Sequence, residues 1–146
     1  APINTVEESK KSRGEIEGGN TKNLFLKNKK NDFFLFSCQE STIIDLKKLK
    51  KTLNLGNISF ARDLYLKDIL GVEPGSVTPF GLINDRNNET RFFLDKNILH
   101  HKKVNFHPLV NTSTISLNAE DFLLFMKKNN KLVNIFNFDN YILENG

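Results

Sequence analysis

The sequence has no tryptophan and only one cysteine, Cys38, among its 146 residues. A single cysteine excludes an internal disulfide bond and favours a reducing compartment, so we expect a cytoplasmic protein. Cys38 ends an apolar run that begins at Phe33, which predicts a small buried side chain rather than a nucleophile. With so few cysteines, a structural zinc site would need an unusual ligand set, and we predict neither a metal nor a cofactor.

Long hydrophobic stretches are also missing. No apolar run approaches the ~20 residues of a membrane-spanning helix, so no membrane association is expected. The first residues, Ala1 to Asn4, carry no methionine and no signal-peptide pattern. We therefore expect one domain spanning residues 1–146, trimmed at its N terminus, and leave open whether it is part of a longer protein.

The common nucleotide, metal and redox motifs do not occur. The sequence contains no GxxxxGK[ST], GxGxxG, HExxH or CxxC pattern and no nucleophile elbow. Its three histidines are His100, His101 and His107. Any catalysis would therefore depend on backbone amides, a lysine, a histidine and groups of the substrate itself.

The positive charge is concentrated in one third of the chain. Residues 1–51 hold 11 Lys and Arg against 7 Asp and Glu, whereas the rest of the chain holds 10 of each. The clusters are at residues 10–13, 27–30 and 47–51. Such clusters could attract a polyanion such as a nucleic acid, but composition alone favours a solvated lysine-rich surface.

Hydrophobic periodicity and turn residues predict a mixed α/β fold with a largely antiparallel or mixed sheet. A first hairpin is expected from residues 22–28 and 33–38, and a second from residues 80–84 and 90–95. Further strands are expected at residues 58–60, 104–109, 112–117 and 131–138. Helices are expected after Thr5, over residues 46–53 behind an Asp45 cap, over residues 62–70 before Gly71, and after Asn118.

Three segments combine polar or glycine-rich residues with strongly apolar ones. They are Thr21 to Lys27, Gly71 to Gly81 and Val104 to Thr114. In this order and spacing they resemble the YbaK/ProX family of aminoacyl-tRNA deacylases, and most closely the branch that clears alanine from tRNA(Pro). The resemblance covers roughly residues 2 to 128. It implies a single YbaK-like domain with a mixed, mostly antiparallel sheet or barrel flanked by helices.

The resemblance also implies roles for individual residues. Lys22 corresponds to the essential lysine of the family, and Asn23 would position the aminoacyl end. The loop from Gly75 to Pro79 matches the family's GxxxP loop, whose amides, beginning at the catalytic Gly75, would stabilise an oxyanion. Val77 belongs to this loop. His107 matches the histidine that bounds the small aminoacyl pocket. The hydroxyls of Ser76 and Thr78 either contact the substrate or cap the loop.

The expected activity is hydrolysis of Ala-tRNA(Pro) by water, with the acceptor end of tRNA(Pro) as partner and no cofactor. One alternative is the sister substrate, Cys-tRNA(Pro). Another is a tRNA-binding module with little catalysis of its own that works with a prolyl-tRNA synthetase in cis or in trans. Asn20 and Asn57 depart from the family pattern at positions where relatives often carry histidine or a basic residue, which weakens the expected tRNA contacts there.

Overall fold

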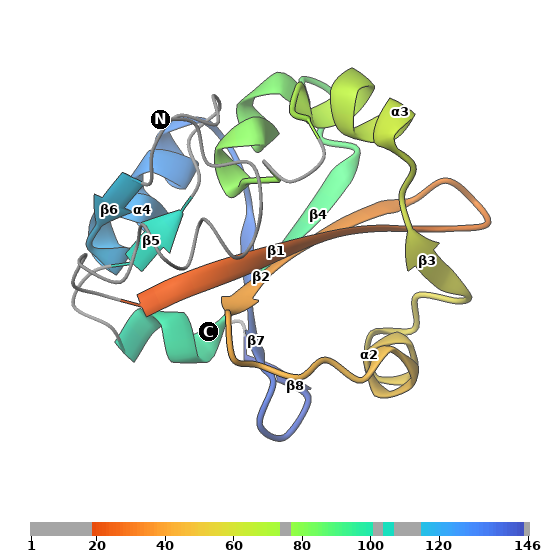
Figure 1. Ribbon diagram of the computed structural model, residues 1–146, viewed down its shortest axis with the longest axis horizontal. Helices are drawn as coiled ribbons and strands as arrows, with labels where there is room; N and C mark the ends of the chain where they lie inside the picture. Colours follow the sequence, from red (N-terminus) through yellow and green to blue (C-terminus); the bar gives the residue numbers. More distant parts are fainter. Residues whose placement is uncertain (1–18, 74–76, 101–103, 107–114, 145–146) are drawn as a thin grey trace.

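The computed structural model describes residues 19–73, 77–100, 104–106 and 115–144 of the chain (Figure 1). In this part of the chain, eight strands form one mixed sheet. Seven of them follow the order β6-β5-β1-β2-β4-β7-β8. The eighth, β3, pairs with the last residues of β1, whereas β5 pairs with its first residues. The strands at the two ends of this order, β6 and β8, are not paired with each other. The mixed α/β class is confirmed, and the sheet is open rather than closed into a barrel.

The first predicted hairpin is confirmed. Strand β1 (Gly19–Asn28) pairs antiparallel with β2 (Phe33–Gln39), and β3 (Ile58–Phe60) adds to the end of β1. Asn31 adopts a positive φ of 61° in the turn, a conformation that asparagine tolerates better than most residues. The side chain of Asn28 organises the same turn, because its Oδ1 accepts from the amides of Lys30 and Asp32.

The second predicted hairpin is wrong. Strand β4 (Thr90–Asp95) is present, but it pairs in parallel with β2 and with β7 (Val133–Asn137). The expected partner segment is instead a 3₁₀ helix, η2 (Pro79–Asn84), whose first four residues are all buried. A short, fully buried apolar run has no period that separates a strand from a helix, and Thr78 caps this one as a helix.

The remaining strands are short. Strand β5 (Val104–Phe106) continues the sheet in parallel beside the start of β1, and β6 (Ile115–Leu117) pairs antiparallel with β5. Strand β8 (Ile142–Leu143) turns back along β7. Strands were thus correctly predicted in the regions of β5 and β6, whose expected continuations into residues 107–114 lie outside the described residues, and β8 was not predicted. The expected helix after Thr5 lies outside the described residues.

Helices cover both faces of the sheet (Figure 1). Helix α2 (Leu46–Leu53) covers one face and begins where predicted, with Asp45 Oδ1 accepting from two amides of its first turn. The other face is covered by α3 (Asp63–Tyr65), the π-helical turn η1 (Leu66–Leu70), η2 and α4 (Ala119–Lys128). A further 3₁₀ helix, η3 (Lys96–His100), follows β4.

Phenylalanine fills both hydrophobic layers. The layer under α2 contains Phe34, Phe36, Phe93 and Phe136, with Phe36 and Phe93 stacked at 4.7 Å between ring centroids. The opposite layer forms around Phe25 and includes aromatic side chains from β4, η2 and α4. Because successive side chains of a strand point to opposite faces, this division tells which face each residue of β1 and β2 occupies.

Gly81 sets how closely η2 packs against η1. A Cβ at this position would lie 2.9 Å from Leu70 O and 3.1 Å from Leu70 Cβ. Leu70 O is already fixed, because it accepts a hydrogen bond from Asn84 Nδ2 at 2.9 Å. The two short helices can therefore approach each other only if residue 81 has no side chain.

We predict that Gly81→Ala lowers the free energy of unfolding by about 1–3 kcal/mol, the usual cost of overpacking a filled core. Urea unfolding followed by circular dichroism would measure the difference. Ile83→Ala is the matched control, because Ile83 belongs to the same helix and is 37% exposed. An equal loss in both variants would show that the close approach at Gly81 is not what matters.

Candidate functional site

The two adjacent residues Lys22 and Asn23 point to opposite faces of β1. Lys22 is the register partner of Cys38, on the face that α2 covers, and Asn23 is the partner of Ser37, on the face that η2 covers. The hairpin register therefore separates the neighbours and gives each its own environment.

The ammonium of Lys22 is held by the segment that follows β2. Its Nζ donates a hydrogen bond to Thr42 O. Thr42 in turn lies against Asp95, because Thr42 Oγ1 donates to Asp95 Oδ2 at 3.4 Å. Three segments distant in sequence thus meet at one end of the sheet, where β1 begins and the parallel strands β2 and β4 finish.

Asp95 is a buried carboxylate that joins these segments. It accepts from the amide of Gln39 at 3.2 Å and from the amide of Asn97 at 2.9 Å, and it is fully buried. Burial raises the pKa of the Asp95 carboxyl, and the hydrogen bonds from Asn97, Gln39 and Thr42 act in the opposite direction. Its role in the described structure is to fix the end of β2 and the segment carrying Thr42.

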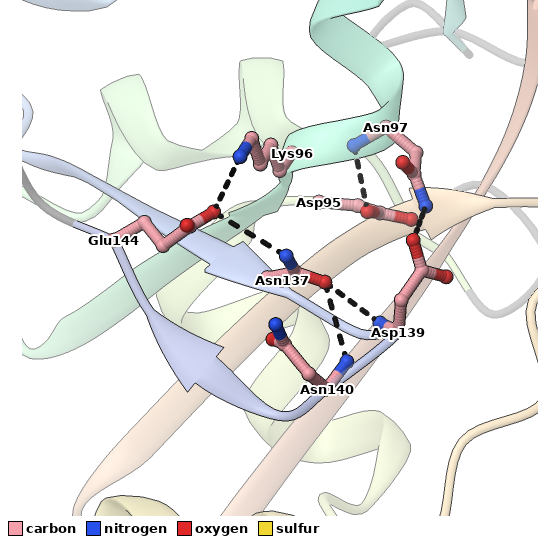
Figure 2. Close-up of polar contacts among 7 residues, drawn as sticks. All are labelled: Asp95, Lys96, Asn97, Asn137, Asp139, Asn140 and Glu144. Atoms are coloured by element: carbon pink, nitrogen blue, oxygen red, sulfur yellow. Dashed lines mark hydrogen bonds and ion pairs between the residues drawn. The ribbon is translucent and has the colours of Figure 1, made fainter.

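Polar contacts continue from Asp95 toward the last strands (Figure 2). Asn97 Nδ2 donates to Asp139 Oδ2 at 3.2 Å, and Lys96 forms an ion pair with Glu144 at 3.0 Å. Asn137 connects the two, because its Oδ1 accepts from the amide of Asp139 and its Nδ2 donates to Glu144. This network ties η3 and the segment after β7 to the end of β4.

The thiol of Cys38 is influenced by two charged side chains of this region, Lys22 and Asp95. Burial raises the pKa of its thiol to about 12, the positive charge of Lys22 lowers it, and the negative charge of Asp95 raises it. Cysteine attacks as a thiolate, so a thiol with this pKa is protonated and unreactive near neutral pH. The expectation of a buried, small hydrophobic side chain at Cys38 is confirmed.

We predict that Cys38→Ala leaves the rate of ester hydrolysis within about threefold of wild type, because a protonated buried thiol cannot act as nucleophile. Single-turnover hydrolysis of an aminoacyl-tRNA, measured below the melting temperature of the variant, checks this. Complete loss of activity in a folded Cys38→Ala protein would instead assign the reaction to the thiol.

On the other face, Asn23 has an unpaired amide. The hydroxyl of Ser37 donates to Asn23 Oδ1, and the Ser37 side chain is fully buried. Asn23 Nδ2 is buried and has no hydrogen-bond partner in the part of the chain that the structure describes. Buried polar groups are nearly always paired, so an amide left with two unused donors requires an explanation, and a substrate acceptor is one.

The described end of the loop from Gly75 to Pro79 is firmly anchored. Thr78 is fully buried and caps η2, with its Oγ1 accepting from the amide of Phe80 at 3.4 Å. Pro79 is buried at the first position of the helix, where its missing amide proton costs nothing. Val77 packs on the same hydrophobic layer as Phe25, which is the face that carries Asn23.

The structure therefore places the described site residues in two groups. Asn23 shares a face with Val77 and the start of η2, whereas Lys22 meets Thr42 on the face of α2. Three further predicted site residues, Gly75, Ser76 and His107, lie outside the described residues. No group of side chains suited to a metal ion is found in the parts of the chain that the structure describes.

Sequence patterns did not reveal Ser37, Thr42 or Asp95. Ser37 could have been found only from the register of the first hairpin, which pairs it with Asn23 and which the sequence did not predict. Thr42 and Asp95 are 53 residues apart and meet only through the parallel pairing of β2 with β4, which the sequence did not predict.

Comparisons with known proteins agree on one family. The model of the aminoacyl-tRNA editing domain matches residues 1–125. The chain is 37% identical over 140 residues to the mouse prolyl-tRNA synthetase associated domain-containing protein 1, covering 92% of this chain and 82% of that protein. It is 34% identical over 129 residues to the prolyl-tRNA editing protein ProX of Acetoanaerobium sticklandii, covering 88% and 79% of the two chains.

A solved structure supports the fold. A crystal structure described as a candidate trans-editing enzyme for prolyl-tRNA synthetase superposes with a TM-score of 0.67, at 19% identity, covering 98% of this chain and 81% of that chain. At this identity the likeness concerns the fold alone. Taken with the match over most of the sequence, it establishes that the chain belongs to the aminoacyl-tRNA editing domain family.

Proposed function

We propose that this protein hydrolyses the ester bond of mischarged tRNA(Pro), with Ala-tRNA(Pro) as the preferred substrate. The observation that carries the proposal is the buried amide of Asn23, whose Nδ2 has no partner among the described residues and which faces the same side of the sheet as the anchored end of the 75–79 loop. An ester carbonyl is an acceptor that such donors can bind, and we propose the cytoplasm as the location of the reaction.

The reaction needs no nucleophile from the protein. A water oxygen attacks the ester carbonyl carbon, negative charge develops on the carbonyl oxygen, and the bond to the ribose oxygen breaks as that oxygen takes up a proton. Asn23 Nδ2 and the loop amides from Gly75 onward would stabilise the developing charge. Lys22, on the opposite face of β1, would exchange its hydrogen bond to Thr42 O for a phosphate near the 3′ end of the tRNA.

The preference for alanine follows from the limits of size selection. A synthetase site for proline cannot strongly reject a smaller side chain, because one missing methylene changes binding by only about 1–3 kcal/mol. A second pocket that excludes proline but admits alanine corrects the error. We assign His107 to the boundary of that pocket, as the family resemblance implies, and a prolyl-tRNA synthetase is the partner in cis or in trans.

The test is a side-by-side hydrolysis assay on Ala-tRNA(Pro), Cys-tRNA(Pro) and Pro-tRNA(Pro). We expect rapid loss of alanine, slower loss of cysteine and no loss of proline. Faster hydrolysis of the cysteinyl ester would assign the chain to the sister specificity. Salt-dependent tRNA binding without turnover of any of the three esters would contradict the proposal and favour a binding module.

A further inference from the structure

Helix α2 carries an uncompensated row of positive charge. Its sequence, LKKLKKTL, has four lysines and no acidic residue. Its inner side is taken up by Leu46, Leu49 and Leu53, which pack into the hydrophobic layer below. The lysines therefore occupy the outer surface, and the helix has no acidic side chain of its own with which to pair them.

Two of the four lysines have partners among the described residues and two have none there. Lys50 Nζ donates to Asn57 Oδ1 at 2.8 Å, and Lys48 Nζ lies 5.7 Å from the centre of the Tyr141 ring. Lys47 and Lys51 are exposed and have no ion pair among the described residues. They are four positions apart, so they share one stripe of the helix, where like charges repel.

The turn between β1 and β2 extends this charge. Lys29 and Lys30 are exposed in the turn, and a shallow hollow of about 290 Å³ lies between the turn and the end of α2. The residues that line the hollow come from both segments, which are Asn28 to Asp32 and Asn54 to Asn57. We call Lys29, Lys30, Lys47 and Lys51 together the α2 lysine surface.

The acidic groups near this surface do not neutralise it. Asp45 Oδ1 is occupied by the amides of Lys47 and Lys48, and Asp32 Oδ2 accepts from Asn28 Nδ2 at 3.0 Å. Neither carboxylate forms an ion pair with a lysine of the surface among the described residues. Four ammonium groups without an ion pair in the described part of the chain form a positive surface that is suited to a polyanion.

The surface is connected to the candidate site through one short segment. Residues 40–45 run from the end of β2 to the start of α2, as Figure 1 shows along its lower edge. Thr42, which holds the ammonium of Lys22, lies in the middle of this segment. A ligand that occupies both the site and α2 would therefore follow this segment.

We infer that the α2 lysine surface binds the phosphate backbone of the tRNA acceptor helix while the 3′ end reaches Lys22, an inference that rests on the proposed function. Proteins contact RNA helices largely through backbone phosphates, and lysines supply point charges for them. The apolar side of α2 is buried in the core, so the helix has no apolar face with which to enter a lipid surface.

The test compares two charge-reversed proteins. Lys47→Glu/Lys51→Glu alters the surface, and Lys127→Glu/Lys128→Glu is the control, because these two lysines are exposed in the last turn of α4, on another side of the molecule (Figure 1). Both variants change net charge equally. Fluorescence anisotropy with uncharged tRNA(Pro) over a series of salt concentrations measures binding independently of hydrolysis.

We expect the α2 variant to bind at least about tenfold more weakly than the control, and the slope of log K against log salt to fall by about two, one for each lost phosphate contact. Equal loss in both variants would overturn the inference, because it would show an effect of net charge alone. Unchanged tRNA binding by the α2 variant would also overturn the inference. So would a charge reversal in α2 that abolishes binding to anionic lipid vesicles and leaves binding to tRNA intact.

The outcome is separable from that of the proposed function. Wild-type protein that binds tRNA through α2 but hydrolyses no ester would refute the activity and support the surface. Protein that hydrolyses Ala-tRNA(Pro) with the same KM in both variants would refute the surface and leave the activity in place.

Discussion

Replacing Lys22 with alanine is expected to lower kcat/KM for hydrolysis of Ala-tRNA(Pro) by about two orders of magnitude, the loss expected when a charged group that positions the substrate is removed. Lys22 is half-buried and makes a single described hydrogen bond, to Thr42 O. A backbone carbonyl is a weak partner for an ammonium group compared with a phosphate or an oxyanion. The substrate can therefore displace Thr42 O at little cost.

The control for this measurement lies on the same strand. Lys27 is also half-buried on β1. Its Nζ donates to Asn31 Oδ1 at 3.2 Å and lies 5.7 Å from the centre of the Tyr65 ring. Lys27→Ala should leave kcat/KM nearly unchanged, since this lysine is near the turn at the other end of β1. Equal rates for wild type and Lys22→Ala would remove Lys22 from the mechanism.

The rescue pattern distinguishes catalysis from positioning. A guanidinium is planar and larger than an ammonium, so Lys22→Arg keeps the charge but changes its shape. If Lys22 only holds the segment at Thr42, arginine should restore most of the activity through the same carbonyl. If Lys22 binds a substrate phosphate, the larger guanidinium should hold that phosphate in a shifted position, and we expect Lys22→Arg to remain well below wild type in kcat while the KM is kept.

The location of the first hairpin was predictable, but its register was not. A symmetric four-residue loop over residues 29–32 would pair Asn28 with Phe33. The structure instead pairs Lys27 with Phe33, because Asn28 belongs to the turn. Its side chain accepts a hydrogen bond from the amide of Asp32, and its own amide donates one to Asp32 O. A shift of one residue moves every side chain to the opposite face. Only the observed register places Ser37 beside Asn23.

The parallel half of the sheet was not predictable from local patterns. Strand β4 follows a buried 3₁₀ helix rather than a hairpin partner, so its neighbours β2 and β7 are far away in sequence. Buried strands in parallel sheets are apolar on both faces, which removes the alternation that would identify them. Asp95 owes its place at the site to this pairing, and no spacing rule connects it with Thr42.

Changing Asn23 to aspartate is expected to lower kcat by about 100-fold, comparable to removing one donor from an oxyanion site. The substitution keeps the shape of the side chain, and Ser37 can still donate to a carboxylate oxygen. It replaces the unpaired Nδ2 with an oxygen that repels the ester oxygen, and it adds a charge at a buried position. Single-turnover kinetics on Ala-tRNA(Pro) measures the loss.

Ser37 tests whether the orientation of this amide matters. Ser37→Ala removes the hydroxyl that fixes Asn23 Oδ1, so the side-chain amide is free to turn. Because small misplacements of a group that contacts the substrate are costly, kcat should fall about tenfold while KM stays nearly unchanged. Thr90→Val is the matched control, because Thr90 Oγ1 is also a buried hydroxyl, has no hydrogen-bond partner among the described residues and lies at the first residue of β4, at the other end of the strand from Asp95. It should change stability but not kcat.

The double variant decides between positioning and packing. If Ser37 acts only by orienting Asn23, then Ser37→Ala should cost nothing further in a protein that already carries Asn23→Asp, because residues that act as a unit are not additive. If the two losses multiply, Ser37 contributes separately, by packing at the centre of the sheet. Non-additive loss in kcat, with equal melting temperatures for the single and double variants, would identify the Asn23 and Ser37 pair as one functional unit.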